Sequence, residues 1–307
     1  MADNLASFKV FCQGGLNTSR DVLSQGETAP GSAIKLTNYE PSVTGGYRKI
    51  NGFSNDYGTV TGTGNVLGVC VANGINDGIL ACRTPSSGNN YLHKWNNSTS
   101  SWDAVTTSGS PTMSGVSKVR FSRLNFGTAK VVLTDGINPA ATYDGSTYTQ
   151  ITHSDAPTDP KFSAIFQNHL FLAGDPAHPT KLYHSAPLAE TDFASGNGAG
   201  VINVGFPIVA IKSFRNELFI FGNTNIKKLS GTALANFAVQ TVTDDLGCLA
   251  TDSVIEIGGD LLFLSQDGLR PISGTDKIGD VNLETVSKDI QSVFTDVVFD
   301  IDLDGLN

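Results

Sequence analysis

Histidine and aspartate are the side chains in this sequence whose types and spacing are closest to those of a metal site. Three of the five histidines, His169, His178 and His184, fall within one 16-residue window. No carboxylate or cysteine lies at a familiar metal-ligand spacing from them. Of the two interpretations, a metal site and histidines in solvated loops, we expect the second.

A second candidate metal site lies in the segment "DIDLDG" near the C-terminal end. Asp300, Asp302 and Asp304 precede Gly305 there. Carboxylates at positions 1, 3 and 5 and glycine at position 6 begin a calcium loop, but the glutamate of position 12 would fall after Asn307. Ile301 and Leu303 alternate with the aspartates, as in an exposed strand edge, which is the alternative that we expect.

Enzymatic motifs are absent from the sequence. It contains no GxxxxGK[ST] phosphate loop, no GxSxG elbow and no HExxH pair. Gly62, Gly64 and Gly68 in "TGTGNVLG" lack the spacing of a dinucleotide loop and predict a glycine-rich loop. Nothing singles out a pair among the 29 Asp and Glu residues for glycoside hydrolysis. We therefore expect a protein that is not an enzyme and has no cofactor, with a propeller hydrolase as the least favoured alternative.

One short phrase occurs three times and predicts the architecture. The copies are "FQNHLFLAG" at Phe166–Gly174, "FRNELFIFG" at Phe214–Gly222 and the looser "IGGDLLFLS" at Ile257–Ser265. They begin 48 and then 43 residues apart (214 − 166 and 257 − 214). In each copy two residues interrupt a β-rich segment, and the second is Asn or Gly, which tolerate the positive φ of a tight turn. Each phrase predicts a β-hairpin, with its turn at Asn168, Asn216 or Gly259.

Two further hairpin-like pairs lie upstream. "GILACRT" at Gly78–Thr84 leads into Tyr91–Val105, and "AKVVLTD" at Ala129–Asp135 leads into Ala141–Ile151. Units that repeat every 43 to 51 residues have the length of four-stranded propeller blades. We predict an all-β chain, a β-propeller or partial propeller of about five blade-like units. A β-sandwich with coincidental hairpins is the alternative.

The two ends of the chain stand outside this repeat. The N-terminal stretch contains two possible strands around the turn Thr44–Gly46, and "NLETVSKDIQSVF" at Asn282–Phe294 has helical periodicity, followed by the strand-like "DVVFDIDL". We therefore divide the chain into an N-terminal strand region at 1–54, propeller blades at 55–280, and a helix with a terminal strand at 281–307. Two interpretations of the last part stay open, a short protein that ends there and a truncated one whose remainder is missing.

The composition favours short strands joined by tight turns. The chain has 33 glycines and 16% charged residues, against about 25% charged in average globular proteins. A net charge of −9 without a Lys/Arg run argues against a nucleic-acid binder that holds phosphate groups through clustered cations.

The four cysteines follow no metal spacing, and we expect buried thiols rather than a Cys70–Cys82 disulfide. Neither a secretion signal nor a membrane-spanning run is present, so we expect folding in a reducing cytoplasm.

The stretch Gly14–Phe53 resembles the N-terminal region of virion proteins of tailed bacteriophages. Its Gly-Gly-Leu-Asn start, the strand ending in "NYEP" and the following "GGYRK" carry the likeness. The succession "FQNHLFLAGDPAHPTKLYHSAPLAETDF", "PIVAIKSFRNELFIFGNTNIKKLSGT" and "GCLATDSVIEIGGDLLFLSQDGLRPIS" is similar to the tail nozzle (tail tubular protein B) and related tail-accessory proteins of short-tailed phages. The resemblance runs from Gly14 to about Val293. Members of that family are often longer.

The resemblance implies a structural virion protein that assembles with copies of itself into a ring, commonly a hexamer, below the portal and adaptor proteins. Such a ring extends the DNA channel, retains the genome until ejection and seats tail fibres or spikes. It is assembled in the host cytoplasm and resides in the virion. Genomic DNA would pass without sequence-specific binding, because an acidic wall repels phosphate.

Two sets of residues are candidates for contacts in such a ring. The turns at Asn168, Asn216 and Gly259 are candidate interface tips at one end of the blades, and Gly14–Phe53 is a candidate for contact with a neighbouring subunit. The alternative function is a carbohydrate- or receptor-binding propeller. Its candidate residues are Tyr91, Trp95 and Trp102, for which packing within a blade is the plainer interpretation.

Overall fold

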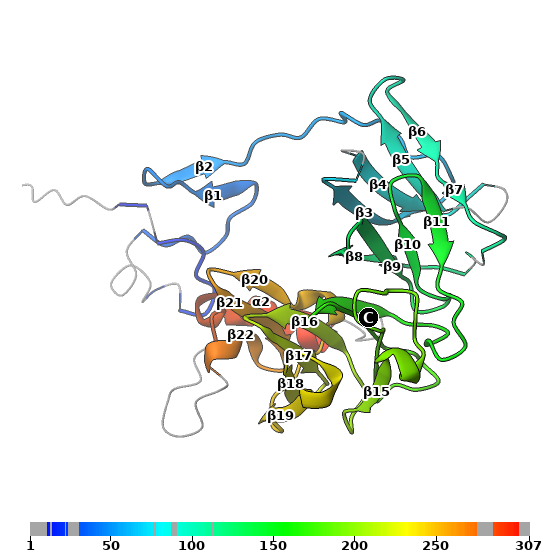
Figure 1. Cartoon of the computed structure of the whole chain (residues 1–307). Helices are drawn as coiled ribbons and strands as arrows, with labels where there is room; N and C mark the ends of the chain where they lie inside the picture. The colour runs from blue at the N-terminus through cyan, green and yellow to red at the C-terminus, as the bar shows by residue number, and fades with distance from the viewer. Residues whose placement is uncertain are drawn as a thin grey trace, which may run out of the picture. The chain divides into compact units, whose positions relative to one another are not determined.

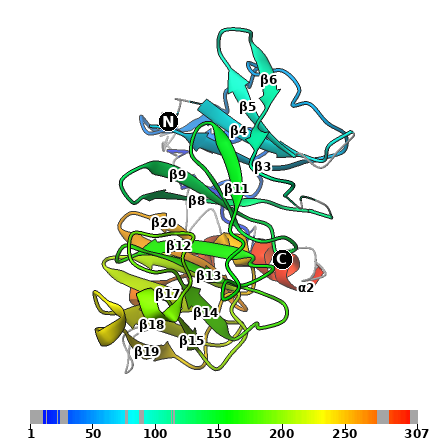
Figure 2. The ribbon, with the colours of Figure 1, turned by 45° about the vertical axis from the view of Figure 1, so that its right-hand side comes forward.

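The protein was analysed as a computed structural model that describes residues 11–12, 14–21, 23, 31–75, 78–86, 91–111, 113, 115–274 and 285–300, the last five by their backbone alone. The chain forms two compact units. The larger one comprises Asn55–Val254, and the smaller one combines Met1–Ser54 with Ile255–Asn307. Figures 1 and 2 show the elements of each unit from two directions.

Four sheets follow one another along the larger unit. The first has the order β3-β4-β5-β6, the second β7-β11-β10-β9-β8, the third β12-β13-β14-β15 and the fourth β16-β17-β18-β19. The first sheet comprises β3 (Val66–Ala72), β4 (Gly78–Arg83), β5 (Leu92–Asn96) and β6 (Ser101–Ala104). The second comprises β7 (Thr106–Thr107), β8 (Arg120–Asn125), β9 (Ala129–Thr134), β10 (Ala141–Tyr143) and β11 (Thr147–Gln150). The third comprises β12 (Phe162–Phe166), β13 (His169–Ala173), β14 (Lys181–His184) and β15 (Gly200–Asn203). The fourth comprises β16 (Ala210–Phe214), β17 (Glu217–Phe221), β18 (Ile226–Ser230) and β19 (Ala238–Thr243). Short 3-10 helices lie at η1 (Ser195–Asn197), η2 (Leu234–Asn236) and η3 (Thr251–Ser253).

The smaller unit contains a fifth blade-like sheet and a separate hairpin. The sheet has the order β20-β21-β22, with β20 at Ile255–Ile257, β21 at Asp260–Ser265 and β22 at Gly268–Pro271. The hairpin pairs β1 (Tyr39–Pro41) with β2 (Tyr47–Lys49). The 3-10 helices η4 (Ile272–Gly274) and η5 (Lys288–Ile290) and the helix α2 (Gln291–Asp300) complete this unit.

These elements confirm the predicted fold class. The described chain is all-β except for short helical segments, and it contains five blade-like sheets, an N-terminal strand region and a C-terminal helix. In every blade consecutive strands pair antiparallel, and the parallel partner of β11, β7, comes from the end of the preceding repeat. A meander of this kind is a blade of the β-propeller architecture.

The hydrophobic cores lie between consecutive sheets of the larger unit. One cluster joins the first and second sheets, and includes Leu80 and Tyr91 on one side and Val131 and Tyr148 on the other. A second joins the second and third sheets, and a third joins the third and fourth. All five residues of β13 are buried, because neighbouring sheets cover both of its faces. The apolar segment of each repeated phrase is therefore a central strand of its blade.

The three hairpins predicted from the repeated phrase are present. Phe166 pairs with His169, Phe214 with Glu217 and Ile257 with Asp260, so each loop has two residues. Both residues of every loop have positive φ, with values of 46° and 62° at Gln167-Asn168, 48° and 61° at Arg215-Asn216, and 62° and 80° at Gly258-Gly259. Positive φ at both loop residues defines a type I′ turn, whose twist matches that of the strands.

The C-terminal helix lies further along the chain than predicted. Within the predicted helix Asn282–Phe294, residues 282–284 lie outside the described part, and α2 begins only at Gln291. It continues through residues 296–300, for which a strand was predicted, and that prediction is wrong. The start of α2 is fixed by the N-terminal segment, because the Gln291 amide donates to Ser19 Oγ over 3.1 Å and the Thr18 amide donates to the Asp289 carbonyl over 2.8 Å. A contact between the two ends of the chain thus overrides the local strand preference of the valines.

The glycine-rich segment is a loop only in part. Gly62 and Gly64 lie in bends before the first sheet and have positive φ, whereas Gly68 lies within β3. A Cβ atom on Gly68 would lie 2.5 Å from the Val119 carbonyl oxygen. Glycine is needed there because β3 and the segment preceding β8 approach closely, and the Val119 amide donates to the Leu67 carbonyl over 2.9 Å.

Substitution of Asn216 tests the type I′ turn. A β-branched side chain is strained at a φ of 61°, so we expect Asn216→Val to lower the free energy of unfolding by about 1–2 kcal/mol. Asn216→Gly should change it by less than about 0.5 kcal/mol, because glycine adopts this conformation freely. Urea denaturation provides the measurement. The matched control is Asn125→Val on the exposed end of β8, and equal losses at both positions would contradict the turn assignment.

Candidate functional site

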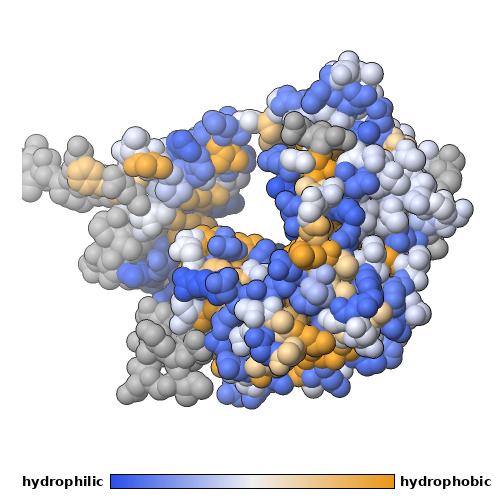
Figure 3. All heavy atoms as spheres, viewed as in Figure 1, coloured by the Kyte–Doolittle hydropathy of each residue, from blue (hydrophilic) through white to orange (hydrophobic). Residues whose placement is uncertain are grey.

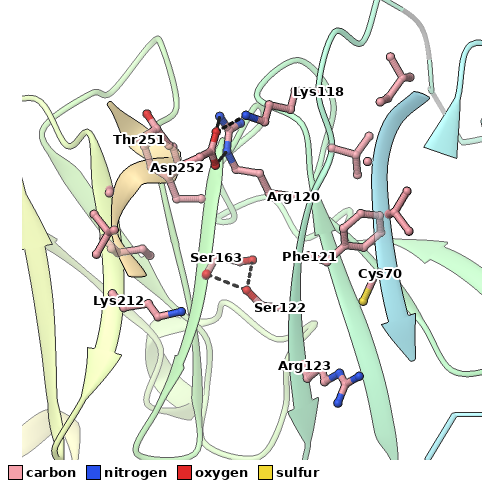
Figure 4. A pocket seen from close by; sticks show the side chains of 18 of the residues that line it. Cys70, Lys118, Arg120, Phe121, Ser122, Arg123, Ser163, Lys212, Thr251 and Asp252 are labelled. Carbon is pink, nitrogen blue, oxygen red and sulfur yellow. Dashed lines mark hydrogen bonds and ion pairs between the residues drawn. The ribbon is translucent and has the colours of Figure 1, made fainter. Parts of the chain in front are cut away.

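A cavity of about 800 Å³ opens among the first strands of the four sheets in the larger unit. Its walls come from β3, β8, β12 and β16, together with η3 (Figure 4). The side chains at its centre are a hydroxyl pair, in which Ser163 Oγ donates to Ser122 Oγ over 2.8 Å and the Ser122 hydroxyl donates to the Ser163 carbonyl over 2.8 Å. This pair joins the first strands of two consecutive blades.

Two cations share one carboxylate at one end of the cavity. Arg120 donates to Asp252 through Nε and Nη2 over 2.8 and 2.9 Å, and the Lys118 ammonium donates to the same carboxylate. Burial disfavours the charged form of Asp252. The hydrogen bonds and charges of Arg120 and Lys118 outweigh that effect and hold its pKa below the ordinary value. Asp252 is therefore the anionic centre of this end of the site.

A third cation lies close to this ion-pair group. Lys161 Nζ and the Arg120 guanidinium approach the ring of Phe162, at 5.7 and 5.6 Å from its centroid. Burial lowers the pKa of Lys161, and the charges of Arg120 and Lys118 lower it further, whereas Asp252 opposes the shift. Lys161 therefore adds a third positive charge close to Asp252.

Two more cations line the rest of the cavity. Arg123 donates to the Val71 carbonyl, and Lys212 projects from β16 toward the Ser122–Ser163 pair (Figure 4). Among the described residues, the Lys212 ammonium has no hydrogen-bond or ion-pair partner. In a chain with a net charge of −9, the lining thus contains four cations and one carboxylate, which are Lys118, Arg120, Arg123, Lys212 and Asp252. We call this set the basic cavity.

Sequence reasoning missed the basic cavity because its cations form no continuous Lys/Arg run. Lys118, Arg120 and Arg123 lie within six residues of one repeat, whereas Lys212 comes from another repeat. Arg120, Arg123 and Lys212 do share one feature, which is a place on the first strand of a blade. An alignment of the repeats by their first strands would have brought them together, because first strands line the axis of a propeller.

The predicted turn tips are exposed at separate blades. Asn168 and Asn216 each join the first and second strands of consecutive blades in the larger unit, and Gly259 occupies the same position in the blade of the smaller unit. The Asn168 carbonyl accepts a hydrogen bond of 2.8 Å from the Leu188 amide. The role of these tips in an interface stays a prediction.

The histidines do not all lie in solvated loops, so that expectation is wrong for two of them. His169 and His184 belong to β13 and β14 and are buried, with their ring centroids 5.2 Å apart and within 6 Å of the ring of Phe237. His178 is exposed and lines a second cavity of the larger unit. Imidazole is flat and partly apolar, and it therefore packs with Phe in a blade core.

Of the three predicted calcium ligands, only Asp300 lies within the described part of the chain. Asp300 is the last residue of α2, and Asp302 and Asp304 lie outside the described part of the chain. Among the residues that the structure describes, no three His, Cys, Asp or Glu side chains form a group that could hold a metal ion. The described portion also contains no helix long and apolar enough to cross a membrane.

The three aromatic residues considered for sugar binding do not form one exposed surface. Tyr91 is buried, and its hydroxyl lies 3.3 Å from that of Tyr148. Trp95 and Trp102 pair across β5 and β6 in an edge-to-face contact, with centroids 5.4 Å apart. The Trp102 indole N–H donates to the Tyr57 carbonyl over 2.8 Å. The packing interpretation therefore accounts for Tyr91 and for the polar group of Trp102.

The cysteines are free thiols wherever the structure describes them. Cys82 and Cys248 are buried, Cys70 is half-buried and Cys12 is exposed. Cys70 lies opposite Leu80 in the β3–β4 register, while Cys82 lies opposite Gly68, so the two cysteines are not a directly opposed pair. Burial raises the pKa of the Cys70 and Cys82 thiols. Neither has the lowered pKa that marks a reactive cysteine.

Comparison with known proteins finds likeness only at the level of structure. No protein-family model matches the sequence, and no curated protein matches it. The solved structures with similar folds include BBS1N in its complex with ARL6DN, at 9% identity and a TM-score of 0.43 over 67% of this chain and 62% of that one. They also include the extracellular domain of a hybrid two-component system from B. thetaiotaomicron, at 6% identity and a TM-score of 0.48 over 73% of this chain and 30% of that one. The chain spans less than two thirds of the length of either structure.

The buried histidines predict how stability depends on pH. Burial lowers the pKa of His184, and a hydrogen bond to the Ser185 carbonyl only partly opposes the shift. Because the folded state favours the neutral ring, its contribution to stability is complete above about pH 6.5, the ordinary histidine pKa, and is lost as the pH falls through the lowered value. His93, whose pKa burial also lowers, adds to the same trend.

We expect His184→Phe to weaken this loss of stability between pH 7 and pH 5, because phenylalanine keeps the ring packing and cannot be protonated. The urea midpoint at each pH is the measurement. His178→Phe, at an exposed position, should leave the pH dependence unchanged. An identical slope in wild type and His184→Phe would show that His184 does not cause it.

Proposed function

We propose that this chain is a structural β-propeller subunit of a tailed-bacteriophage virion. In this proposal it forms a ring, with six subunits as the expected number, that extends the DNA channel at the neck or tail and retains the genome until ejection. The resemblance of Gly14–Phe53 and of the repeated phrases to tail nozzle proteins supports it, together with the propeller architecture.

The observation that carries the proposal is the exposure of large apolar side chains along the N-terminal segment. Val43 and Phe53 are fully exposed at 99% and 101%, and Tyr39 and Ile50 are about half exposed. Hydrophobic atoms are visible on this part of the surface in Figure 3. Exposed apolar groups concentrated in one segment indicate a protein interface.

A second copy of the chain is the partner that this segment fits best. A closed ring needs a heterologous interface, in which one surface of each subunit binds a different surface of its neighbour. A short hairpin with exposed apolar residues can supply one side of that contact. Of its strand residues, Arg48 and Glu40 form a surface ion pair of 2.7 Å across β1 and β2, which keeps the hairpin in register.

The charge distribution agrees with a wall past which DNA moves. The net charge is −9, and four of the twenty Lys and Arg residues line the basic cavity. Because the cavity lining holds four cations and one carboxylate, the rest of the chain has a larger excess of acidic over basic residues than the net charge suggests. An acidic surface repels phosphate and lets DNA pass without adhesion.

The proposal predicts assembly on a portal–adaptor complex. Light scattering should give the mass of the chain alone and with the portal–adaptor complex of the phage that encodes it, and we expect added mass equal to a fixed number of subunits. Val43→Ser with Ile50→Ser should reduce that assembly at least tenfold, because it removes apolar contact from the N-terminal segment. Val201→Ser, at a half-exposed valine of β15, is the control.

A chain that adds no mass to the complex would contradict the proposal. A melting temperature that rises with specific glycans would instead favour the alternative, a carbohydrate- or receptor-binding propeller module. Equal assembly by wild type and the Val43→Ser, Ile50→Ser variant would remove the N-terminal segment from the interface.

A further inference from the structure

We propose that the basic cavity binds a small multivalent anion that carries phosphate or carboxylate groups. This inference concerns the larger unit by itself and does not depend on the proposed virion function. The residues assigned to the anion are Lys212 and Arg123, with Lys118 and Arg120 at the end occupied by Asp252.

The first argument is the imbalance of charge within the cavity. Asp252 is the single carboxylate of the lining, and Arg120 and Lys118 already share it. Lys161 lies close to them as a further cation, because its Nζ and the Arg120 guanidinium both approach the ring of Phe162. Like charges gathered in one cavity repel one another. A bound anion would supply the missing negative charge.

The second argument is the set of hydrogen-bond donors left available. Lys212 has three ammonium protons and no partner within the described residues. Arg123 donates to the Val71 carbonyl and to the Cys70 thiol, from a group with five N–H donors. These donors come from β16 and β8, on different walls of the cavity, and the Ser122–Ser163 hydroxyls lie between those walls (Figure 4). An anion with two charged groups could bridge them. Arginine and lysine are the side chains that bind phosphate and carboxylate most strongly.

The third argument is size and surroundings. A volume of about 800 Å³ lies in the range of small-molecule sites, roughly 300–1,000 Å³, and it cannot admit duplex DNA. Apolar side chains of β3 and β16, including Val69, Val71 and Ile211, form part of the wall.

The test is isothermal titration calorimetry of the full chain at pH 7 and low ionic strength. Inorganic pyrophosphate and citrate are the two probes, and they separate a phosphate ligand from a carboxylate ligand of similar charge. We expect at least one to bind with a stoichiometry near one per chain. The double variant Arg123→Gln, Lys212→Gln should bind it at least tenfold more weakly.

A gain of affinity provides a test that misfolding cannot imitate. Asp252→Asn removes the carboxylate that competes for Arg120 and Lys118 and keeps its shape, so we expect about tenfold tighter binding. Lys181→Gln on β14 outside the cavity is the matched control for loss of one positive charge and should bind as wild type does. Unchanged far-ultraviolet circular dichroism confirms that each variant is folded.

The inference is overturned if neither probe binds to wild type. It is also overturned if the Arg123→Gln, Lys212→Gln variant binds as tightly as wild type, or if Lys181→Gln loses as much affinity as that variant. Tighter binding of pyrophosphate identifies phosphate as the ligand chemistry, and tighter binding of citrate identifies carboxylate.

Discussion

Apolar packing between one blade and the next is the interaction on which the rest of this structure depends. The four-stranded sheet that contains β13 has a central strand that is buried on both faces. On its own, such a sheet would expose these apolar side chains to water. Each large side chain buried in this way contributes about 1.5–3 kcal/mol through removal of apolar surface from water. The three clusters of the larger unit each draw residues from two consecutive sheets. The blades therefore stabilise one another, and a single blade would have no comparable core.

The cavity is a consequence of the same packing. Side chains that fill the space between blades come from first, second and third strands, and first strands such as β8 and β16 also present residues to the cavity. Polar and charged groups are tolerated there because water or a ligand can reach them. The Ser122–Ser163 pair and the contact of Gly68 with the Val119 carbonyl set how closely the first strands approach. The basic cavity thus combines a rigid frame with donors that the frame does not use.

The two ends of the chain meet within the smaller unit. Ser19 Oγ accepts a hydrogen bond from the Gln291 amide and donates one to the Lys288 carbonyl over 2.7 Å. The Thr18 amide donates to the Asp289 carbonyl. The first bond satisfies the Gln291 amide, which α2 itself leaves open, and the other two satisfy the Lys288 and Asp289 carbonyls just before it. The N-terminal segment therefore stabilises a helix about 270 residues away. Other apolar side chains of the same segment, such as Val43, stay exposed.

The three hairpins and their repeat could be predicted from the amino-acid sequence alone. Two loop residues ending in Asn or Gly, between apolar strands, permit only a small number of turns, and at Asn168, Asn216 and Gly259 the structure contains the type I′ turn that such residues favour. The signal is local, because φ at a turn depends on the residue itself. The spacing of those hairpins then predicted the blade architecture.

Three features depend on tertiary contacts and could not be predicted from the sequence. They are the position of α2, the burial of His169 and His184, and the basic cavity. Valines that favour a strand lie in a helix because Ser19 and Thr18 bind its first turn. The two histidines are buried because β13 and β14 lie inside a blade, although their spacing suggested loops. Three cations of the cavity lie at 118–123, on β8 or just before it, and Lys212 lies about 90 residues later on β16, so no local pattern connects the two groups. Each of these features depends on which blade packs beside which, and a sequence read along its length does not contain that information.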